Sequence, residues 1–424
     1  MLNVKISNLG KIITGKTPST KCPENFCGPY PFITIPDLEN RKYIINTERT
    51  LSEFGADTMR SCLLPKGSIV ISCIATLGKC GIVTTPSFSN QQINALIPDD
   101  NLSSEFLYYV FCTLLPDLEA VAGGGSVYGN VSKSKFGNIE IVIPNFKQQH
   151  AIASILGSLD DKIDLNRRTN ETLETMARTL FRDWFVDFGP TRAKMAGEAP
   201  YLAPELWELF PDGLDEEGKP EGWLYKSISS LGEVVCGKTP STKNSLFYGD
   251  DVPFITIPDM HNKVFTYNTR RYLSTLGANS QHKKTLPPLS ICVSCIATPG
   301  LVTLTKIPSQ TNQQINAIIP SEKRNAFFIY ETMRALSQEI QSQGSGGSVF
   351  FNLNTGKFKE INILLPTQDI LNFFHKNVCS TFEKILDNDE QSQTLTQLRD
   401  LLLPKLMSGE ISIRDAEKMV EDAA

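Results

Sequence analysis

A glycine-lysine-threonine motif occurs twice in this chain, with the spacing of a loop that binds phosphate. Residues 10–17 and 232–239 both satisfy G-x-x-x-x-G-K-[ST], in which backbone amides and the lysine hold phosphates where a helix begins. In both copies the threonine precedes Pro-Ser-Thr-Lys, which is typical of a turn, and Pro18 disfavours helical geometry at Thr17. Residues 11–13 also have the character of a strand. We therefore expect a strand and a turn here, and keep a phosphate-loop nucleotidase as an alternative.

Other patterns that could support catalysis are weak. Asp37 and Glu39 resemble part of a nuclease carboxylate cluster, but the second copy of this segment has His261 in place of Glu39. The chain also lacks an Asp/Asn-Pro-Pro-Tyr run for amino-group methyl transfer, a nucleophile elbow and a His-Glu-x-x-His zinc helix. No Cys-x-x-Cys occurs among the ten cysteines. We expect reduced thiols, no metal site and a chain without catalytic activity.

The strongest feature of the sequence is an internal repeat. A shift of 222 positions places residues 9–144 on 231–366 without a gap. The matching segments, each given with its copy, are 15–21 with 237–243, 31–37 with 253–259, 72–76 with 294–298, 90–95 with 312–317, and 124–127 with 346–349. A repeat of this length is a duplicated domain, which predicts two equivalent sites on one chain.

Each half consists of a mixed module followed by a long helix. Short β-rich runs at 31–36, 68–75, 93–97 and 139–143, with an apolar helical pattern at 103–118 and a glycine-rich turn at 123–125, predict an α+β module. The organisation that we expect is one module at 1–146, a long helix at 147–188, a connector at 189–221, a second module at 222–366, and a second long helix with a tail at 367–424.

The two long helices carry matching heptad seams. From Ile152 to Trp184 and from Phe374 to Leu406, positions that alternate by four and three residues are mostly apolar. Both seams turn polar at the same place, at Asn166 and at Asn388. Two amphipathic helices that pack separately on their own modules remain an alternative. We favour an antiparallel coiled coil that relates the modules by a pseudo-twofold axis and holds them at a set distance.

Charge is distributed unevenly along the chain. Lys and Arg against Asp and Glu number 13 against 12 in residues 1–150, 8 against 15 in 151–221, 14 against 8 in 222–366, and 6 against 11 in 367–424. Neutral-to-basic modules and acidic helices allow the modules to bind DNA despite a net charge of -5. No apolar run is long enough to span a membrane, and the N-terminus lacks the pattern of a signal peptide, so we expect a cytoplasmic protein.

The polar residues of the modules suit contacts with nucleic acid. Amides such as Asn90 and Gln91 can pair with adenine, although a role as buried polar scaffold is the favoured alternative. Lys, Ser and Thr near turns suit phosphate oxygens. Segments 57–63 and 79–85 differ from their copies, as expected of loops that set specificity. The candidate DNA-binding residues are Lys16, Thr17, Lys21, Arg60, Thr76, Lys79, Asn90, Gln91, Lys133, Lys135, Lys238, Thr239, Lys243, His282, Lys283, Lys284, Thr298, Asn312, Gln313 and Lys357.

Several segments together resemble a known family. These are Lys66-Gly-Ser-Ile-Val-Ile-Ser72, Asn90-Gln-Gln-Ile-Asn-Ala95, Gln148-Gln-His-Ala-Ile-Ala-Ser-Ile-Leu156, Met176-Ala-Arg-Thr-Leu-Phe-Arg-Asp-Trp-Phe-Val-Asp-Phe188 and Leu398-Arg-Asp-Leu-Leu-Leu-Pro-Lys-Leu-Met-Ser-Gly-Glu410. In their order over essentially the whole chain, they are similar to the specificity subunits of type I restriction–modification systems. The two modules are more alike than is usual in that family.

The resemblance implies a division of labour. Each module would be a target recognition domain that reads half of a bipartite site in double-stranded DNA. The long helices would set the spacer and dock two modification (methyltransferase) subunits, through which restriction (translocase–nuclease) subunits join. S-adenosylmethionine, ATP and Mg would belong to those partners, with no cofactor on this chain.

A set of large apolar side chains near the helix ends has two interpretations, partner docking and core packing. Its members are Phe181, Trp184, Phe185, Phe188, Leu402 and Leu406. A tandem scaffold that binds only proteins is the remaining alternative function.

Overall fold

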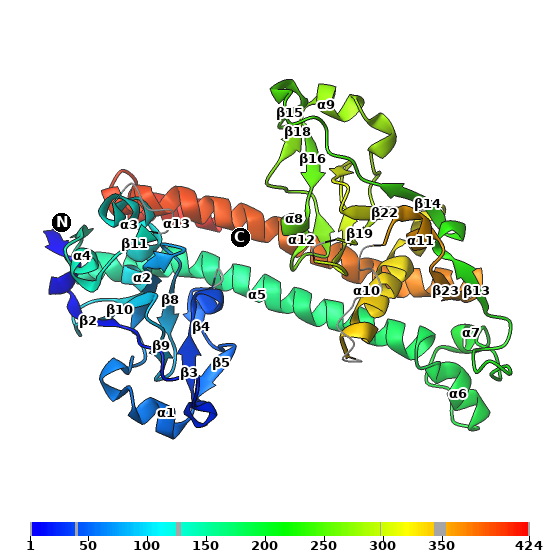
Figure 1. Cartoon of the computed structure of the whole chain (residues 1–424), viewed down its shortest axis with the longest axis horizontal. Helices are drawn as coiled ribbons and strands as arrows, with labels where there is room; N and C mark the ends of the chain where they lie inside the picture. The colour runs from blue at the N-terminus through cyan, green and yellow to red at the C-terminus, as the bar shows by residue number, and fades with distance from the viewer. Residues whose placement is uncertain (1, 39–40, 124–128, 297, 343–352, 423–424) are drawn as a thin grey trace. The chain divides into compact units, whose positions relative to one another are not determined.

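The chain folds into two compact units, each built from one copy of the repeat and parts of both long helices. The computed structural model describes residues 2–38, 41–123, 129–296, 298–342 and 353–422. Unit 1 comprises Met1–Arg167 and Glu390–Ala424, and unit 2 comprises Arg168–Asp389. Each boundary falls inside a long helix, because the two ends of each helix belong to different units (Figure 1). Glu39 and the glycine-rich repeat at 124–127 and 346–349 lie outside the described residues.

Unit 1 contains the first mixed module. Its strands are β1 (Leu2–Lys5), β2 (Gly10–Thr14), β3 (Phe26–Ile33), β4 (Tyr43–Ile44), β5 (Arg49–Leu51), β6 (Ile69–Ser72), β7 (Ile74–Ala75), β8 (Cys80–Val83), β9 (Phe88–Ser89), β10 (Ile93–Pro98), β11 (Gly129–Asn130) and β12 (Glu140–Ile143). Its helices are α1 (Glu53–Asp57), α2 (Ser104–Cys112), α3 (Leu115–Ala122), α4 (Lys133–Gly137) and α13 (Ile413–Glu421), with 3-10 turns η1 (Ile6–Asn8), η2 (Pro23–Asn25), η3 (Ile35–Leu38) and η4 (Arg60–Cys62).

Unit 2 repeats this order after the connector. Its strands are β13 (Leu224–Ser227), β14 (Gly232–Cys236), β15 (Tyr248–Gly249), β16 (Val252–Ile255), β17 (Phe265–Thr266), β18 (Tyr272–Leu273), β19 (Ile291–Ser294), β20 (Val302–Thr305), β21 (Gln310–Thr311), β22 (Ile315–Pro320) and β23 (Asn362–Leu365). Its helices are α6 (Gly189–Met195), α7 (Pro204–Trp207), α8 (Ile257–Met260), α9 (Thr275–Asn279), α10 (Ala326–Ser342) and α11 (Thr355–Lys359), with η5 (Ile228–Ser230), η6 (Ser245–Phe247), η7 (His282–Lys284) and η8 (Lys323–Asn325).

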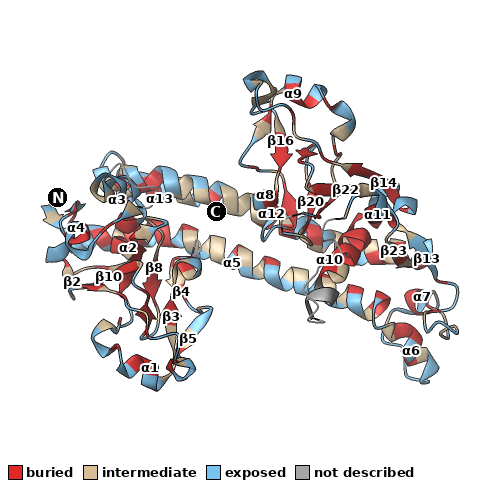
Figure 2. Ribbon diagram, viewed as in Figure 1, coloured by how far each residue is buried: buried red, intermediate tan, exposed pale blue. Residues whose placement is uncertain are grey.

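Both modules are built on the same five-stranded sheet. Its order is β2-β10-β6-β8-β4 in unit 1 and β14-β22-β19-β20-β17 in unit 2. All neighbours are antiparallel except the last pair of each sheet, β4 with β8 and β17 with β20. Ile69 and Ile71 of β6 face one apolar cluster with α2, whereas Val70 faces another with Ile93. Burial on both faces explains the continuous apolar run of this strand, and Figure 2 shows the central strands as buried.

The long helices pair within each unit, which confirms the predicted coiled-coil seam. They are α5 (Phe146–Phe185, 40 residues) and α12 (Gln368–Ser408, 41 residues). In unit 1, Ile152, Leu156 and Leu159 of α5 share one core with Leu395 and Leu402 of α12. The equivalent core of unit 2 joins Ala177 and Phe181 to Phe374, Val378 and Ile385. Since the start of α5 pairs with the end of α12, the helices are antiparallel.

The polar break in the seam is a network of buried amides. In unit 2, Asn388 Nδ2 donates to Asn170 Oδ1 at 2.8 Å, and Asn170 Nδ2 donates to the Ile385 carbonyl at 3.1 Å and to Asp389 Oδ1 at 2.9 Å. In unit 1, Asn166 Nδ2 donates to Gln391 Oε1 at 2.9 Å. These bonds join specific pairs of residues and therefore form in one register of the two helices only.

The connector contains two short helices that its composition did not predict. These are α6 and α7, and Trp207 at the end of α7 and Phe210 after it are buried. Trp184 at the end of α5 packs edge-on against Phe210, with ring centroids 5.4 Å apart. The sequence did not predict α6 and α7, because helices of seven and four residues are too short to repeat an apolar pattern.

A buried carboxyl group adjoins the helix pair in unit 2. Glu331 of α10 is 1% exposed, and no donor among the described residues contacts its Oε1. Burial raises the pKa of Glu331 to about 7, while Arg334 and Arg178 oppose the increase. Arg334 itself pairs with Glu174 of α5 at 2.8 Å.

We predict that replacing Asn170 destabilises unit 2. Asn170→Ala removes three hydrogen bonds from a buried seam, the one that Asn170 accepts from Asn388 and the two that it donates, so the free energy of unfolding should fall by about 1–3 kcal/mol. Chemical denaturation measures the change. Thr172→Ala, an exposed site on the same helix, is the matched control and should stay within about 0.5 kcal/mol of the parent. Equal stability of Asn170→Ala and the parent would contradict a structural role for the network.

We predict a pH-dependent effect of Glu331→Gln. The unfolded glutamate ionises near 4.5 and the folded one near 7, so this group makes the parent lose stability as pH rises between these values. Glutamine removes that loss, and the variant should gain about 1–3 kcal/mol over the parent between pH 5 and pH 8. Denaturation at several pH values tests this. Exposed Glu360→Gln is the control, and a parallel response of both variants would contradict the prediction.

Candidate nucleic-acid interface

Three loops of the first module meet at one end of its five-stranded sheet. Asn94 of β10 accepts from Thr14 Oγ1 at 2.6 Å and donates to the Val131 carbonyl at 3.3 Å. Cys73 N donates to the Gln92 carbonyl at 2.8 Å, and Val131 N donates to the Cys73 carbonyl at 2.9 Å. These bonds bring together the turn after β2, the turn before β10, and the β7–β11 pair. We call this end of the sheet the polar edge.

The second module has the same polar edge. Asn316 of β22 accepts from Thr355 Oγ1 at 3.1 Å and donates to Cys295 Sγ at 3.3 Å. Cys295 N donates to the Gln314 carbonyl at 2.9 Å. The frame is therefore kept in both copies although individual partners differ.

The glycine of the repeated glycine-lysine-threonine motif serves backbone packing. A Cβ on Gly15 would lie 2.1 Å from the Asn90 carbonyl oxygen, and a Cβ on Gly237 would lie 2.1 Å from that of Asn312. Lys16 N donates to the Ser89 carbonyl at 2.9 Å. The motif begins as strand β2 and the next element is the three-residue turn η2, so no helix starts at the lysine. This geometry disfavours the phosphate-loop alternative.

The repeated amides divide into scaffold and surface. Asn90 is buried, donates to Gln92 Oε1 at 3.0 Å and accepts from Gln92 N at 3.0 Å. Asn312 makes the same two bonds with Gln314. Of the two roles left open by the sequence, these asparagines fit the scaffold. Gln91 and Gln313 are exposed instead.

Hydroxyl groups hold the exposed glutamines at the polar edge. Thr17 Oγ1 donates to Gln91 Oε1 at 2.6 Å, and Thr239 Oγ1 donates to Gln313 Oε1 at 2.7 Å. The Lys16 and Lys238 side chains beside them are exposed. The polar edge therefore combines a cation, a hydroxyl and an amide in each module.

Other predicted residues lie on the adjoining β7–β11 and α4 segments. Thr76 and Lys133 are exposed, whereas Lys79 is half-buried and its backbone N donates to Ser72 Oγ at 2.9 Å. Lys135 Nζ donates to the Val121 carbonyl at 2.7 Å, which engages its ammonium within the module. Thr298 and Lys357 are the exposed equivalents of Thr76 and Lys135 in the second module. Ala75 adopts φ 65°, a left-handed conformation that is uncommon for alanine.

The predicted residues of η4 and η7 adjoin a second, smaller sheet in each module, which we call the smaller layer. Its strand order is β5-β3-β9 in unit 1 and β15-β18-β16-β21 in unit 2. Arg60 of η4 pairs with Asp57 at 2.7 Å, and His282, Lys283 and Lys284 form η7. Lys21 and Lys243 are exposed in the turns that lead into this layer. The predicted DNA-binding residues thus lie in two groups of loops rather than one.

Sequence reasoning missed two glutamines that connect η7 with the polar edge. Gln281 Nε2 donates to the Lys238 carbonyl at 2.8 Å and to Gln310 Oε1 at 2.8 Å. Both side chains are buried, and the first module has apolar Met59 and Phe88 at the equivalent positions. The sequence did carry a signal for this contact, because two glutamines in the second copy align with two apolar residues in the first.

Carboxylates of the suspected nuclease pattern cap turns. Asp37 Oδ2 accepts from Thr34 N at 2.7 Å and from Thr34 Oγ1 at 2.6 Å, and Asp259 repeats this with Thr256. These bonds account for the aspartates structurally. Among the described residues, no three His, Cys, Asp or Glu side chains form a group able to hold a metal ion, and no helix is long and apolar enough to cross a membrane.

The large apolar residues of the helix ends pack in the cores. Those that are buried are Phe181, Trp184, Phe185, Leu402 and Leu406, whereas Phe188 is half-buried. Phe185 contacts the rings of Phe328 and Phe374 at centroid distances of 5.0 and 5.1 Å. Core packing therefore explains the five buried side chains, which face the interior and present no docking surface.

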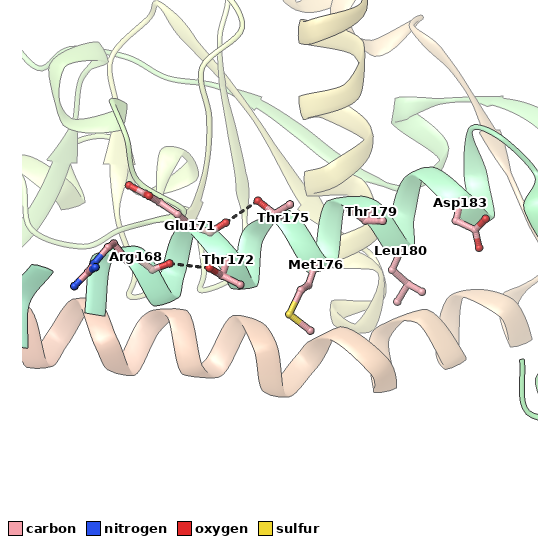
Figure 3. A pocket seen from close by; sticks show the side chains of 8 residues that line it. All are labelled: Arg168, Glu171, Thr172, Thr175, Met176, Thr179, Leu180 and Asp183. Carbon is pink, nitrogen blue, oxygen red and sulfur yellow. Dashed lines mark hydrogen bonds between the residues drawn. The ribbon is translucent and has the colours of Figure 1, made fainter. Parts of the chain in front are cut away.

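A row of α5 side chains in unit 2 borders a shallow surface groove. Figure 3 shows Thr172, Thr175, Met176 and Thr179 along the helix, and the groove is lined by Arg168, Glu171, Thr172, Thr175, Met176, Thr179, Leu180 and Asp183. Met176, a large apolar side chain between threonines, is 59% exposed.

Comparison with known proteins identifies the family. The family model for the type I restriction modification DNA specificity domain matches residues 1–175 and 220–394. The chain is 43% identical over 318 residues to the type I restriction enzyme HindI specificity subunit of Haemophilus influenzae, covering 65% of this chain and 69% of the relative. It is 30% identical over 418 residues to the MjaIX specificity subunit of Methanocaldococcus jannaschii, covering 97% and 93%.

A solved structure supports the same fold. The crystal structure of a type I restriction–modification S subunit from M. genitalium aligns with a TM-score of 0.53 at 17% identity, over 96% of this chain and 95% of that chain. Two family domains, two curated relatives and the shared fold agree. The chain belongs to the DNA specificity subunits of type I restriction–modification systems.

Proposed function

We propose that each module reads one half of a bipartite site in double-stranded DNA through its polar edge and the neighbouring η4 or η7 loop. The observation that carries this proposal is the duplication of the polar edge together with the divergence of the loops beside it. Equivalent frames with different loops suit two half-sites that are related in sequence and inverted in orientation. The two helices would set the number of unread base pairs between them.

We also propose that two modification subunits dock on the helices and that restriction subunits join through them. S-adenosylmethionine, ATP and Mg would be bound by these partners, and the complex would act on DNA in the cytoplasm. The α5 groove supports a docking face, because the apolar side chain of Met176 is exposed there. The aromatic residues near the end of α5 are buried and offer no such surface. Leu401 of α12 is the equivalent of Thr179 of α5 in the internal repeat. It is 49% exposed and offers a similar face in unit 1.

We predict that a chain with two copies of the second module directs its modification subunit to methylate a symmetric site. Residues 224–366 would replace their equivalents, 2–144, and the chimera would be expressed with its modification subunit in a methylation-free host. Genome-wide mapping of methylated bases should give two identical half-sites in inverted orientation. The parent chain is the control and should give two different halves. A chimera motif that keeps both parental halves would contradict one module per half-site.

We predict that DNA affinity of the specificity–modification complex falls steeply with salt. Contacts with several phosphates release counterions, so log K should decrease linearly with log salt, by about 0.9 per phosphate contacted. Filter binding or fluorescence anisotropy at several salt concentrations measures the slope. A flat response would instead favour the tandem protein scaffold.

We predict that Met176→Glu weakens docking of a modification subunit. A charge in the apolar part of the groove should reduce affinity by about tenfold, which co-purification or surface plasmon resonance would detect. Met195→Glu is the matched control, because Met195 is equally exposed (56%) on α6 and does not line the groove. Equal binding by both variants would contradict a docking face at Met176.

A further inference from the structure

The paired threonines and glutamines of the polar edge have a chemistry that restricts what they can bind. We infer that Lys16, Thr17 and Gln91, and equally Lys238, Thr239 and Gln313, form two sites for a DNA backbone phosphate that do not select bases. This inference rests on the proposed function and assigns a role to one part of the interface. We call the two sets of three residues the anchors.

The hydrogen bond of each glutamine decides what the amide can offer. An amide reads adenine in the major groove by donating and accepting together. Gln91 Oε1 already accepts from Thr17 at 2.6 Å, and Gln313 Oε1 from Thr239 at 2.7 Å. Neither Nε2 group has a partner among the described residues, so both of its N–H donors are available, whereas the threonine already occupies one of the two lone pairs of Oε1. A phosphate oxygen, which only accepts, matches this arrangement.

The adjoining lysine adds the charge that a phosphate requires. Lys16 N is held by the Ser89 carbonyl and Lys238 N by the Thr311 carbonyl, both at 2.9 Å, so the backbone of each lysine has the same anchorage. Both side chains are exposed, and within the described part of the chain no acceptor engages either ammonium. A free cation next to a donating amide is typical of backbone contacts that position a protein on DNA.

The frame beneath each anchor is rigid and duplicated. Gly15 lies against the Asn90 carbonyl and Gly237 against the Asn312 carbonyl, with no room for a Cβ. The side chains of these two buried asparagines close the neighbouring turns by bonding to Gln92 and Gln314. The exposed threonine–glutamine bond adds little to folding stability, because both groups can also bond to water. Stability therefore does not explain why both copies keep this bond, whereas a shared ligand does.

The opposite interpretation is that the anchors read a base. An amide that donates through Nε2 can also donate to guanine O6 or N7 or to thymine O4. In that case both half-sites would share such a base at the same position, and changing the glutamine would change the motif. The two interpretations therefore differ in whether the loss of affinity depends on sequence.

The test uses the full chain assembled with its modification subunit. DNA affinity would be measured against salt on the methylated motif and on an unrelated duplex, for Lys16→Ala with Lys238→Ala and for Gln91→Glu with Gln313→Glu. The lysine pair should lower the salt slope by about two, with equal loss on both duplexes. The glutamate pair places negative charge against phosphate and should lower the affinity for both duplexes by at least tenfold. The sequence of the methylated motif should stay unchanged.

Controls separate the anchors from general charge and from folding. Lys11→Ala with Lys323→Ala removes two exposed lysines near the other ends of β2 and β22, and should leave affinity within about twofold. Thr17→Val tests a positioning residue, and it should weaken binding less than Gln91→Glu does. Thermal unfolding of each variant checks that the module remains folded.

The outcomes distinguish this inference from the proposed function. A changed base in the methylated motif of the glutamate pair, or an unchanged salt slope of the lysine pair, would overturn the phosphate anchors. If the parent complex itself showed neither salt dependence nor a preferred motif, the proposed function would fail instead.

Discussion

The structure depends on the antiparallel pairing of α5 with α12. Each module completes its core only with residues from both helices: Leu156 and Leu402 lie in one cluster with strands of the first module, and Phe181 and Phe374 lie in one cluster with strands of the second. Hydrophobic burial drives this pairing but is tolerant of register. The buried asparagines supply the register, because their hydrogen bonds form in one alignment only.

A duplicated frame with different loops explains how one chain presents two related surfaces. The central sheet, the glycine at the end of its first strand and the aspartate caps recur with matching geometry. The smaller layer differs, since Met59 and Phe88 in one module correspond to Gln281 and Gln310 in the other. Buried amides require complete hydrogen bonding, and Gln281 and Gln310 donate to the Lys238 and Ala278 carbonyls, while the order of the central sheet stays the same.

Much of the fold could be predicted from the sequence, because its signals are local or periodic. The repeat, the heptad seams and the polar break at Asn166 and Asn388 all follow from spacing, and the structure confirms the α+β modules and the helix seam. The family followed from the order of motifs. Short helices in the connector were missed, because their packing against Trp184 is a tertiary effect.

The roles of individual site residues were harder to predict. Asn90 and Gln91 are adjacent and both polar, yet one is buried scaffold and the other is exposed. That difference depends on how the turn closes against β2, which no local pattern records. Likewise, an aromatic residue near a helix end, such as Phe185, suits partner docking and core packing equally in the sequence. Its contacts with Phe328 and Phe374 place it in a core.

Lengthening the helix pair tests the central claim most directly. Seven residues would be inserted in α5 between Arg167 and Arg168 and seven in α12 between Asp389 and Glu390, which keeps the heptad seam in phase. Two added turns extend each helix by about 10 Å, or about three base pairs. Methylation mapping should then give unchanged half-sites with a gap longer by about three base pairs. A folded, active complex with the original gap would contradict the claim that these helices set the spacing.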